Sequence, residues 1–338
     1  MIQTLIDRPH HIAFMEKPIP VPSPGEVLVQ VCATGICATD VHSYLGETIH
    51  GNTFPFHPGH EIAGVVSAAG EGVSRFAVGD HVVVSPLTYC GICENCLDGQ
   101  WNFCTDIRAI GLIGPGGFSD YVVSAERNLV PYRHSTAIQI SLAEPLATVL
   151  HALSLVKIRP DRLMLIQGAG TLGLLFLKVL KNHFHCSRVQ VSDTLPERLA
   201  CAQANGGLPT SPESLAGVQK VFDLVVDCTG NAQAVQNTIP MLRNGGQLVI
   251  FGVCKHDATI SISPFEVYRR QLSVIGSFAL NHNIKDAVDM IESKTIEVDD
   301  LVSGVVRRDQ LVATLEGLAT RQLAGKYVVA LSEIDSGW

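Results

Sequence analysis

The chain has 338 residues, of which 46% are hydrophobic and 17% are charged, a composition typical of a folded globular protein and not of a disordered one. This length exceeds the size at which a single hydrophobic core stops growing, so two domains are expected. The formal net charge is −8 and no basic run occurs, which makes nucleic acid and anionic membranes poor candidate partners.

The first residues do not have the pattern expected of a signal peptide, and a series of short strands is predicted after them. Asp7 interrupts the first residues, no apolar run follows a basic start, and no later window is apolar enough for a membrane span, so we expect a cytoplasmic protein. Four β-branched runs are bounded by Gly, Pro or Asp: residues 27–31, 62–66, 82–84 and 121–123. These runs predict an irregular, mostly antiparallel β domain.

A cysteine-rich loop follows in the same half of the chain. Four of the ten cysteines lie in a C-x-x-C-x-x-C-x7-C pattern: Cys90, Cys93, Cys96 and Cys104. In a reducing compartment such a cluster favours a metal site over disulfides. Four thiolates can surround one tetrahedral Zn²⁺, and an iron–sulfur cluster or two disulfides are the alternatives. Four sulfurs around one metal leave no position for a substrate, so this loop is expected to support the fold and not the chemistry.

Beyond residue 143 the pattern changes to strands that alternate with helices. Five apolar runs predict buried strands: residues 162–167, 188–193, 222–227, 247–252 and 272–277. Three stretches between them predict helices: residues 171–184, 196–204 and 232–242. This alternation indicates a parallel sheet with helical crossovers. Two more helical stretches, at residues 284–293 and 310–321, and a strand at residues 326–331 close the chain.

The loop after the first of these strands has the sequence GAGTLG and matches G-x-G-x-x-G between a buried strand and a helix. Glycines there allow a tight turn and close approach of a pyrophosphate, and the helix N-terminus offers free N–H groups to the phosphates. Dinucleotide contacts are therefore expected from five residues: Gly168, Gly170, Thr171, Leu172 and Gly173.

Asp193 ends the second strand of this half, where an acid meets the ribose hydroxyls of a bound dinucleotide. A carboxylate there repels a 2′-phosphate, which favours NAD over NADP. Arg198 could contact the ribose from the following helix, although a nearby arginine can also accommodate a phosphate. The alternative interpretation is a surface aspartate and a glycine turn without a ligand.

A second metal site, open to substrate, requires ligands outside the cysteine loop. The segment GICATDVH supplies Cys37, HPGHEIAG supplies His60 and Glu61, and LAEPLA supplies Glu144. One thiolate, one imidazole and a carboxylate suit Zn²⁺ and leave room for water or substrate. From the residues alone, a buried Cys37 and a hydrogen-bonded His60 without a metal are about as well supported as two ligands.

The segment after Cys37 carries further candidates. Asp40 is a candidate partner for His60 that would fix the tautomer of its imidazole. Thr39 and His42 could pass a proton outward, and Ser43 and Tyr44 are expected to line the pocket.

Together these motifs resemble the zinc-dependent medium-chain dehydrogenase/reductase family. The resemblance rests on GIC-x-TD, GHE, the cysteine loop and the glycine loop, and extends from VPSPGEVLVQVCATGIC to GKYVV. GHE with AEP is similar to the polyol (sorbitol/xylitol) and threonine dehydrogenase branch, whereas alcohol dehydrogenases proper have a cysteine where Glu144 stands. The family implies an α/β protein. Residues 1–145 would form a GroES-like, mostly antiparallel β catalytic domain, with a structural zinc lobe at about residues 88–106. Residues 146–283 would form a Rossmann NAD-binding domain with a doubly wound parallel sheet, and residues 284–338 would return to the catalytic domain.

The resemblance also implies roles for the candidate residues. Cys37 and His60 would hold a catalytic zinc, joined by Glu61 or Glu144, while Asp40 orients His60. Thr39 would accept the substrate hydroxyl proton and relay it towards His42 through the cofactor ribose. Cys90, Cys93, Cys96 and Cys104 would hold a structural zinc. The implied reaction is hydride transfer from a secondary alcohol of the polyol or sugar alcohol class to NAD, giving a ketone, with two zinc ions per chain.

Some features leave alternatives open. Ala279 stands where sorbitol dehydrogenases carry an arginine for the polyol, so threonine, an aldose or a polyol phosphate are alternative substrates on the same site. A non-catalytic nucleotide-binding relative is the alternative from another functional class, and it would be expected to lose the zinc ligands or Thr39. The strand-rich stretch at residues 247–277 could pair across a two-fold axis, as in relatives, which suggests a homodimer or homotetramer.

Overall fold

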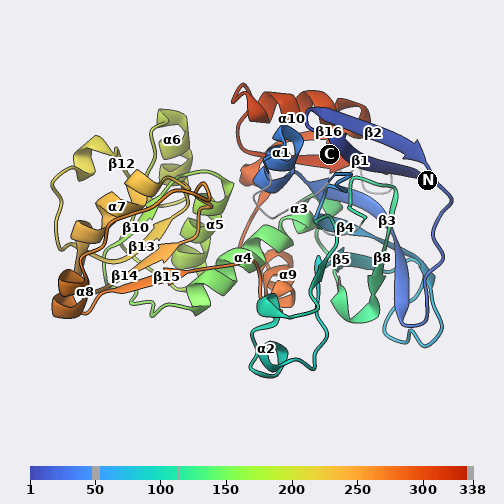
Figure 1. Ribbon diagram of the computed structural model, residues 1–338, viewed down its shortest axis with the longest axis horizontal. Coiled ribbons are helices and arrows are strands. Elements are labelled where there is room, and N and C mark those ends of the chain that lie inside the picture. Colours follow the sequence, from blue (N-terminus) through green and yellow to red (C-terminus); the bar gives the residue numbers. More distant parts are fainter. Residues whose placement is uncertain (48–53, 113–114, 333–338) are drawn as a thin grey trace. The chain divides into compact units, whose positions relative to one another are not determined.

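The computed structural model describes residues 1–47, 54–112 and 115–332, and the chain forms two compact units (Figure 1). The first unit comprises Met1–Ala147 and Asn281–Trp338, and the second comprises Thr148–Leu280. The chain therefore leaves the first unit after Ala147 and re-enters it at Asn281. Within the described ranges, no helix has the length and apolar character needed to cross a membrane.

The second unit is built on a six-stranded sheet of order β12-β11-β10-β13-β14-β15, in which all neighbours are parallel. Its strands are β10 (Met164–Gln167), β11 (Val189–Ser192), β12 (Leu208–Thr210), β13 (Phe222–Asp227), β14 (Leu242–Ile250) and β15 (Ser273–Gly276). Its helices are α5 (Thr171–Lys178), continued by a π-helical turn (Val179–His183), α6 (Pro196–Ala204), α7 (Ala232–Met241) and α8 (Pro264–Arg270). Every residue of β10 and β13 is buried, as expected for central strands covered on both faces. The predicted parallel α/β half is confirmed.

The first unit contains a seven-stranded sheet of order β16-β17-β3-β4-β5-β9, with β8 paired to β3. Its strands are β3 (Glu26–Gly35), β4 (Glu61–Ala69), β5 (His81–Val84), β8 (Tyr121–Ala125), β9 (Leu129–Pro131), β16 (Val302–Arg307) and β17 (Lys326–Ala330). Only β16 and β17 pair in parallel among the described strands of this sheet. Val27, Val29 and Val31 alternate along β3 and pack with Ile62 and Val82 in one core cluster, which is the two-residue period of a strand. The predicted mostly antiparallel β domain is confirmed.

A second core of this unit joins the hairpin β1 (Ile2–Arg8) and β2 (His11–Glu16) with the helices α1 (Ala38–Leu45) and α10 (Leu311–Ala319). Tyr44 lies in this core at 1% exposure and donates its hydroxyl to Glu316 Oε1 at 3.0 Å. The expectation that Tyr44 lines the pocket is therefore wrong. Its ring packs against apolar side chains because α1 turns this face towards α10.

The cysteine loop extends away from the seven-stranded sheet and carries the short helix α2 (Glu94–Leu97) (Figure 1). The two-residue strands β6 (Leu87–Thr88) and β7 (Arg108–Ala109) pair at its base. The first unit also contains α3 (Ala137–Ser141) and α9 (Ile284–Glu292), and α4 (Ala143–Ser154) begins in the first unit and ends in the second. At the end of α9, Glu292 accepts hydrogen bonds from the backbone of Arg133, His134 and Ser135 and so ties α9 to the segment before α3.

Candidate active site and metal centres

The first candidate centre forms where β3 and β4 pair with Gly35 opposite Glu61. A Cβ on Gly35 would lie 1.9 Å from Glu61 Oε2, so glycine at this position leaves room for the carboxylate. Cys37 follows β3 as the N-cap of α1, and His60 directly precedes β4. The pairing thus places one ligand atom each of Cys37, His60 and Glu61 within 4.8 Å of one another.

The charge around His60 is predominantly negative. His60 is 5% exposed and its Nδ1 has no hydrogen-bond partner. Burial alone would lower the pKa of His60, but the neighbouring Cys37, Asp40 and Glu144 raise it well above its usual value. An imidazole surrounded by acidic groups marks a position where a cation is stabilised.

Asp40 lies beside His60 without hydrogen bonding to its imidazole. Its carboxylate accepts from the backbone N–H of Cys37 at 2.9 Å and of Gly59 at 3.0 Å, and Oδ1 lies 4.0 Å from His60 Nδ1. That last distance is too long for a hydrogen bond. Orientation of His60 by Asp40 therefore stays a prediction, and in this structure Asp40 fixes the backbone on both sides of the site.

Glu144 enters from the first turn of α4 and is 7% exposed. Burial raises the pKa of Glu144 to about 7; His60 opposes this shift and Glu61 reinforces it. Glu144 is not a member of the group of ligand atoms within 4.8 Å. The structure thus brings Glu61 together with Cys37 and His60, and places Glu144 beside them.

Lys326, at the start of β17, is a residue of this site that the sequence did not reveal. Its Nζ donates to Glu61 Oε1 at 2.6 Å, to Glu61 Oε2 at 2.5 Å and to the Ile36 carbonyl at 3.1 Å. Both side chains of the pair are at most 5% exposed. Burial would lower the pKa of Lys326, but Glu61 and Cys37 raise it. The only signal in the sequence is a lysine that opens an otherwise apolar strand.

The residues present fit a divalent cation. Three buried carboxylates and a thiol face one lysine and one histidine, and an excess of acidic groups away from water is costly without a cation to balance it. Sulfur, imidazole nitrogen and carboxylate oxygen are the donors that Zn²⁺ takes in proteins.

The predicted proton path begins beside this group. Cys37 Sγ lies 3.7 Å from Thr39 Oγ1 in a sulfur hydrogen bond. His42 lies three residues further along α1, so it shares a helix face with Thr39. A hydrogen bond of 2.5 Å joins His42 Nδ1 to Glu47 Oε2. The sequence did not predict Glu47 as a partner of His42.

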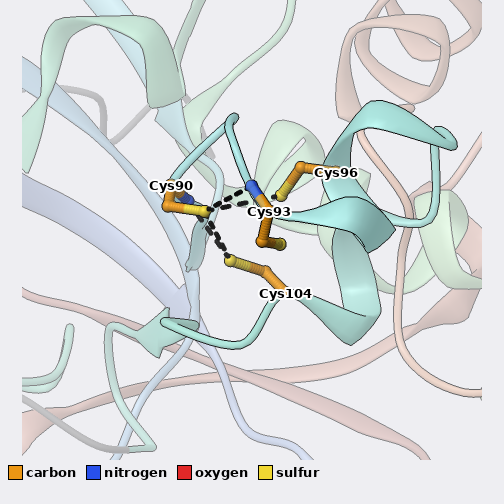
Figure 2. Close-up of side chains that lie close together, drawn as sticks. All are labelled: Cys90, Cys93, Cys96 and Cys104. Carbon is orange, nitrogen blue, oxygen red and sulfur yellow. Dashed lines mark hydrogen bonds between the residues drawn. The ribbon is translucent and has the colours of Figure 1, made fainter.

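The second candidate centre is the cysteine loop, where four side chains converge (Figure 2). Cys104 Sγ lies 3.5 Å and Cys96 Sγ lies 4.0 Å from Cys90 Sγ, far beyond an S–S bond of about 2.05 Å. A tetrahedron with Zn–S bonds of about 2.3 Å has sulfurs about 3.8 Å apart, which matches both distances. The geometry therefore fits a single metal ion.

The thiols of this loop differ in how readily they ionise. Backbone N–H groups of Thr105 and Cys96 lower the pKa of Cys93 to about 6, whereas burial raises the pKa of Cys96 to about 12. Mutual repulsion opposes ionisation of all four sulfurs, and a bound cation removes that opposition.

An aromatic cluster fixes the base of this loop. Tyr89 stacks on Trp101 with ring centroids 5.6 Å apart, and His282 meets Trp101 edge-on at 4.5 Å. Asn281 accepts from the Trp101 backbone N–H at 3.0 Å and donates to the Gly99 carbonyl at 2.9 Å. The loop is thus anchored to the residues at which the chain re-enters the first unit.

The glycine loop of the second unit has the geometry of a phosphate cradle. Gly168 has φ +95°, and a Cβ on Gly173 would lie 1.8 Å from the Gly168 carbonyl oxygen. Gly170 is the N-cap of α5, whose first N–H groups therefore follow the loop directly. The carboxyl ends of β10, β11 and β13 lie in register at Gln167, Ser192 and Asp227, the edge where open parallel sheets bind ligands.

Asp193 stands at this edge with both carboxylate oxygens engaged by backbone groups. Oδ2 accepts from Ala169 N–H at 2.8 Å and Oδ1 from Leu195 N–H at 3.0 Å. Arg198 Nη1 lies 3.6 Å from Asp193 Oδ2. Asp227, which the sequence reasoning missed, accepts from the Thr229 hydroxyl at 2.5 Å at the end of β13, and burial raises its pKa.

Comparison with known proteins identifies the family. The chain matches the alcohol dehydrogenase GroES-like domain over residues 23–134 and the zinc-binding dehydrogenase domain over residues 171–293. It is 38% identical to the D-altritol 5-dehydrogenase of Agrobacterium fabrum, over 87% of this chain and 91% of that protein.

Two solved structures share the whole architecture. A zinc-binding dehydrogenase from Sinorhizobium meliloti 1021 bound to NADP superimposes with a TM-score of 0.89 at 27% identity, over 97% of this chain and 98% of that one. A dehydrogenase from E. coli CFT073 complexed with NADH superimposes with a TM-score of 0.90 at 27% identity, over 98% and 99%. The chain belongs to the zinc-dependent medium-chain dehydrogenase/reductase family, and it is an oxidoreductase that acts on alcohols with zinc and a nicotinamide cofactor.

Proposed function

We propose that the protein oxidises a secondary alcohol of the polyol or sugar alcohol class to a ketone, with NAD as the hydride acceptor. The observation that carries this proposal is the group of Cys37, His60 and Glu61, in which His60 and Glu61 are buried and Cys37 is half-buried, with Thr39 beside it. The relative that acts on D-altritol, a linear polyol, supports the substrate class. Retention of the three ligand atoms and of Thr39 argues against a non-catalytic relative.

Two zinc ions per chain complete the proposal. Cys37, His60 and Glu61 would hold the catalytic ion, and the four cysteines of the loop would hold the structural ion. When bound, the catalytic zinc supplies a Lewis acid that lowers the pKa of the alcohol hydroxyl, and the nicotinamide accepts the hydride. We assign the third ligand to Glu61, because Glu144 lies outside the close group; Lys326 competes with the metal for this carboxylate.

The chain's own residues would handle the proton. Thr39 Oγ1 would accept the hydroxyl proton of the substrate as its own O–H proton leaves towards His42, whose half-exposed imidazole takes up the outgoing proton. Asp40 holds the backbone of Cys37 and Gly59 in place during this transfer.

Preference for NAD over NADP is proposed from Asp193. Its carboxylate lies at the carboxyl end of β11 and would repel a 2′-phosphate. Arg198 is 3.6 Å from that carboxylate, so its charge is already compensated in part and is less available to a phosphate. The two solved structures of similar identity hold different cofactors, and the assignment therefore rests on this chain's own residues.

We also propose a homodimer through the edge of the six-stranded sheet. Among the described strands, β15 is the last of this sheet, and an exposed edge strand is a template for pairing with another chain. Five large apolar side chains around it are between 37% and 84% exposed: Val253, Phe265, Tyr268, Val274 and Phe278. Antiparallel pairing of β15 with its copy is self-complementary and would cover them.

The test is reduction of NAD and of NADP, followed by absorbance, with pentitols, hexitols, aldoses, simple alcohols, threonine and a polyol phosphate. Chelator-sensitive turnover of polyols with NAD is expected. Turnover confined to threonine or to a phosphorylated polyol would replace the substrate class, and turnover of polyols that a chelator leaves unchanged would overturn the zinc assignment.

A further inference from the structure

Helix α1 ends in a turn that only glycine adopts without strain. Gly46 has φ +81° and ψ +14°, and its N–H donates to the Ser43 carbonyl at 3.1 Å. The next residue, Glu47, donates its N–H to the His42 carbonyl at 2.8 Å. A Cβ on Gly46 would lie 2.7 Å from Pro9 Cγ, so both backbone conformation and packing require glycine here. These bonds are those of a Schellman motif.

In this motif the side chain of the residue that follows the glycine contacts a side chain in the last turn of the helix, and both side chains are usually apolar. Here the two residues are Glu47 and His42, and Glu47 Oε2 lies 2.5 Å from His42 Nδ1. Their side chains are 54% and 39% exposed. Because this ion pair is so exposed, it contributes little to the free energy of folding. Fold stability therefore does not explain why the acidic Glu47 stands at a position where an apolar side chain is usual.

The hydrogen bond settles which nitrogen of His42 is free. A carboxylate accepts only, so Nδ1 carries a proton in this pair and Nε2 of the neutral ring is the available acceptor. The neighbouring acids are engaged elsewhere: Glu316 with the Tyr44 hydroxyl, and Asp40 with the backbone of Cys37 and Gly59. Glu47 is thus the carboxylate that hydrogen bonds to the His42 ring in the described part of the chain.

We propose that Glu47 is the positioning residue of the proton path: it holds His42 in the Nδ1–H tautomer so that Nε2 accepts the outgoing proton. The inference rests on the proposed function of His42. As an N–H bond forms at Nε2, the O–H bond that delivered the proton breaks. The carboxylate of Glu47 compensates the charge of the resulting imidazolium, which then releases one proton to bulk water and returns to the Nδ1–H form.

The first test reads the tautomer and does not depend on turnover. Imidazole ¹⁵N chemical shifts of the thirteen histidines are compared for the wild type and Glu47→Ala at an alkaline pH, and the His42 signal is assigned by its absence in His42→Asn. The wild-type ring is expected in the Nδ1–H form, and Glu47→Ala should move it towards Nε2–H. Glu47→Gln, which keeps an acceptor oxygen, should retain the wild-type tautomer, and Glu71→Ala, another exposed acid of this unit, serves as the unchanged control.

The second test reads turnover. Glu47→Ala should lower kcat about 5- to 10-fold without changing KM for the alcohol, a part of the ~10²–10⁴-fold that a positioned acid–base group contributes. Glu47→Gln should fall between the wild type and Glu47→Ala, because it restores the tautomer and not the charge. Glu71→Ala should match the wild type.

The outcomes separate the two proposals. If His42→Ala turns over like the wild type, the proton path itself is wrong and the role of Glu47 falls with it. If His42→Ala loses turnover but Glu47→Ala changes neither the tautomer nor kcat, the inference about Glu47 is overturned while the proposed function stands. A tautomer change with unaltered kcat also overturns it.

Discussion

Replacement of Lys326 by methionine tests the charge balance of the proposed catalytic centre. Lys326 donates to both oxygens of Glu61 at 2.5 and 2.6 Å, and the two side chains are 5% and 1% exposed. Lys326→Met leaves the volume of the side chain nearly unchanged, but it leaves the buried carboxylate of Glu61 without its positively charged partner. Loss of one partner from a buried pair costs about 3–5 kcal/mol. For a unit of roughly 200 residues, 1 kcal/mol corresponds to about 2–4 °C, so metal-free protein should melt roughly 6–20 °C lower.

The assay is thermal unfolding of metal-free protein, followed by circular dichroism, with the double variant Lys326→Met/Glu61→Gln as the matched control. The double variant removes both charges and should be more stable than Lys326→Met alone. Added zinc should stabilise Lys326→Met more than it stabilises the wild type, because Glu61 no longer has a competing partner. A cost of about 3 kcal/mol would lower the melting temperature by at least about 6 °C, so a melting temperature within about 2 °C of the wild type in the metal-free state would show that Lys326 does not balance the charge of Glu61.

Three further predictions concern the other elements of the account. Cys93→Ala should remove one zinc ion per chain and lower the melting temperature, while turnover at 25 °C should stay close to that of the wild type. An unchanged melting temperature and an unchanged zinc content would show that the loop is not a zinc site. Asp193→Ala should raise KM for NAD roughly 10- to 100-fold, as expected for loss of hydrogen bonds to a charged group, and should reduce the preference for NAD over NADP. If the ratio of kcat/KM for NAD to kcat/KM for NADP does not change, Asp193 does not contact the cofactor. Burial would raise the pKa of Glu292, but hydrogen bonds from Ser135, Arg133 and His134 outweigh it and lower the pKa. The carboxylate therefore stabilises the fold above its unfolded pKa of about 4.3 and ceases to do so as the pH falls through its lower folded pKa. Urea titrations should show Glu292→Gln less stable than the wild type at pH 7 and nearly equal to it at the acid end, and a difference that does not depend on pH would contradict this assignment.

The parallel half of the fold could be predicted closely because its strands are continuous apolar runs. The expected helix at residues 196–204 coincides with α6, and the strand at residues 222–227 coincides with β13. The expected helix at residues 171–184 contains α5 and the π-helical turn that follows it. Burial on both faces makes such patterns strong, whereas the β1–β2 hairpin, with exposed residues on both strands, left no clear pattern.

The site was only partly accessible from the sequence for a related reason. Cys37, His60 and Glu61 were expected from their residue types, and pairing of β3 with β4 brings them together. Lys326 is 265 residues from Glu61, and no local pattern indicates that β17 delivers it there. Glu47 is different, because glycine at the end of α1 is a local signal for the turn that places it on His42.

Tyr44 shows the opposite error. Its position near the metal motif suggested a pocket residue, but proximity along a helix does not specify a shared face. Residues Cys37 and Thr39 lie near the start of α1, whereas Tyr44 faces the core with α10.

The most direct test of the central claim is the turnover of Cys37→Ala with NAD and the best polyol substrate, compared with wild type at equal zinc in the buffer. Cys37 is a proposed ligand of the catalytic zinc, and it is not part of the cysteine loop or of the glycine loop. Turnover should be lost, whereas the affinity for NAD and the melting temperature should stay close to those of the wild type. Turnover equal to that of the wild type would contradict the assignment of the catalytic centre.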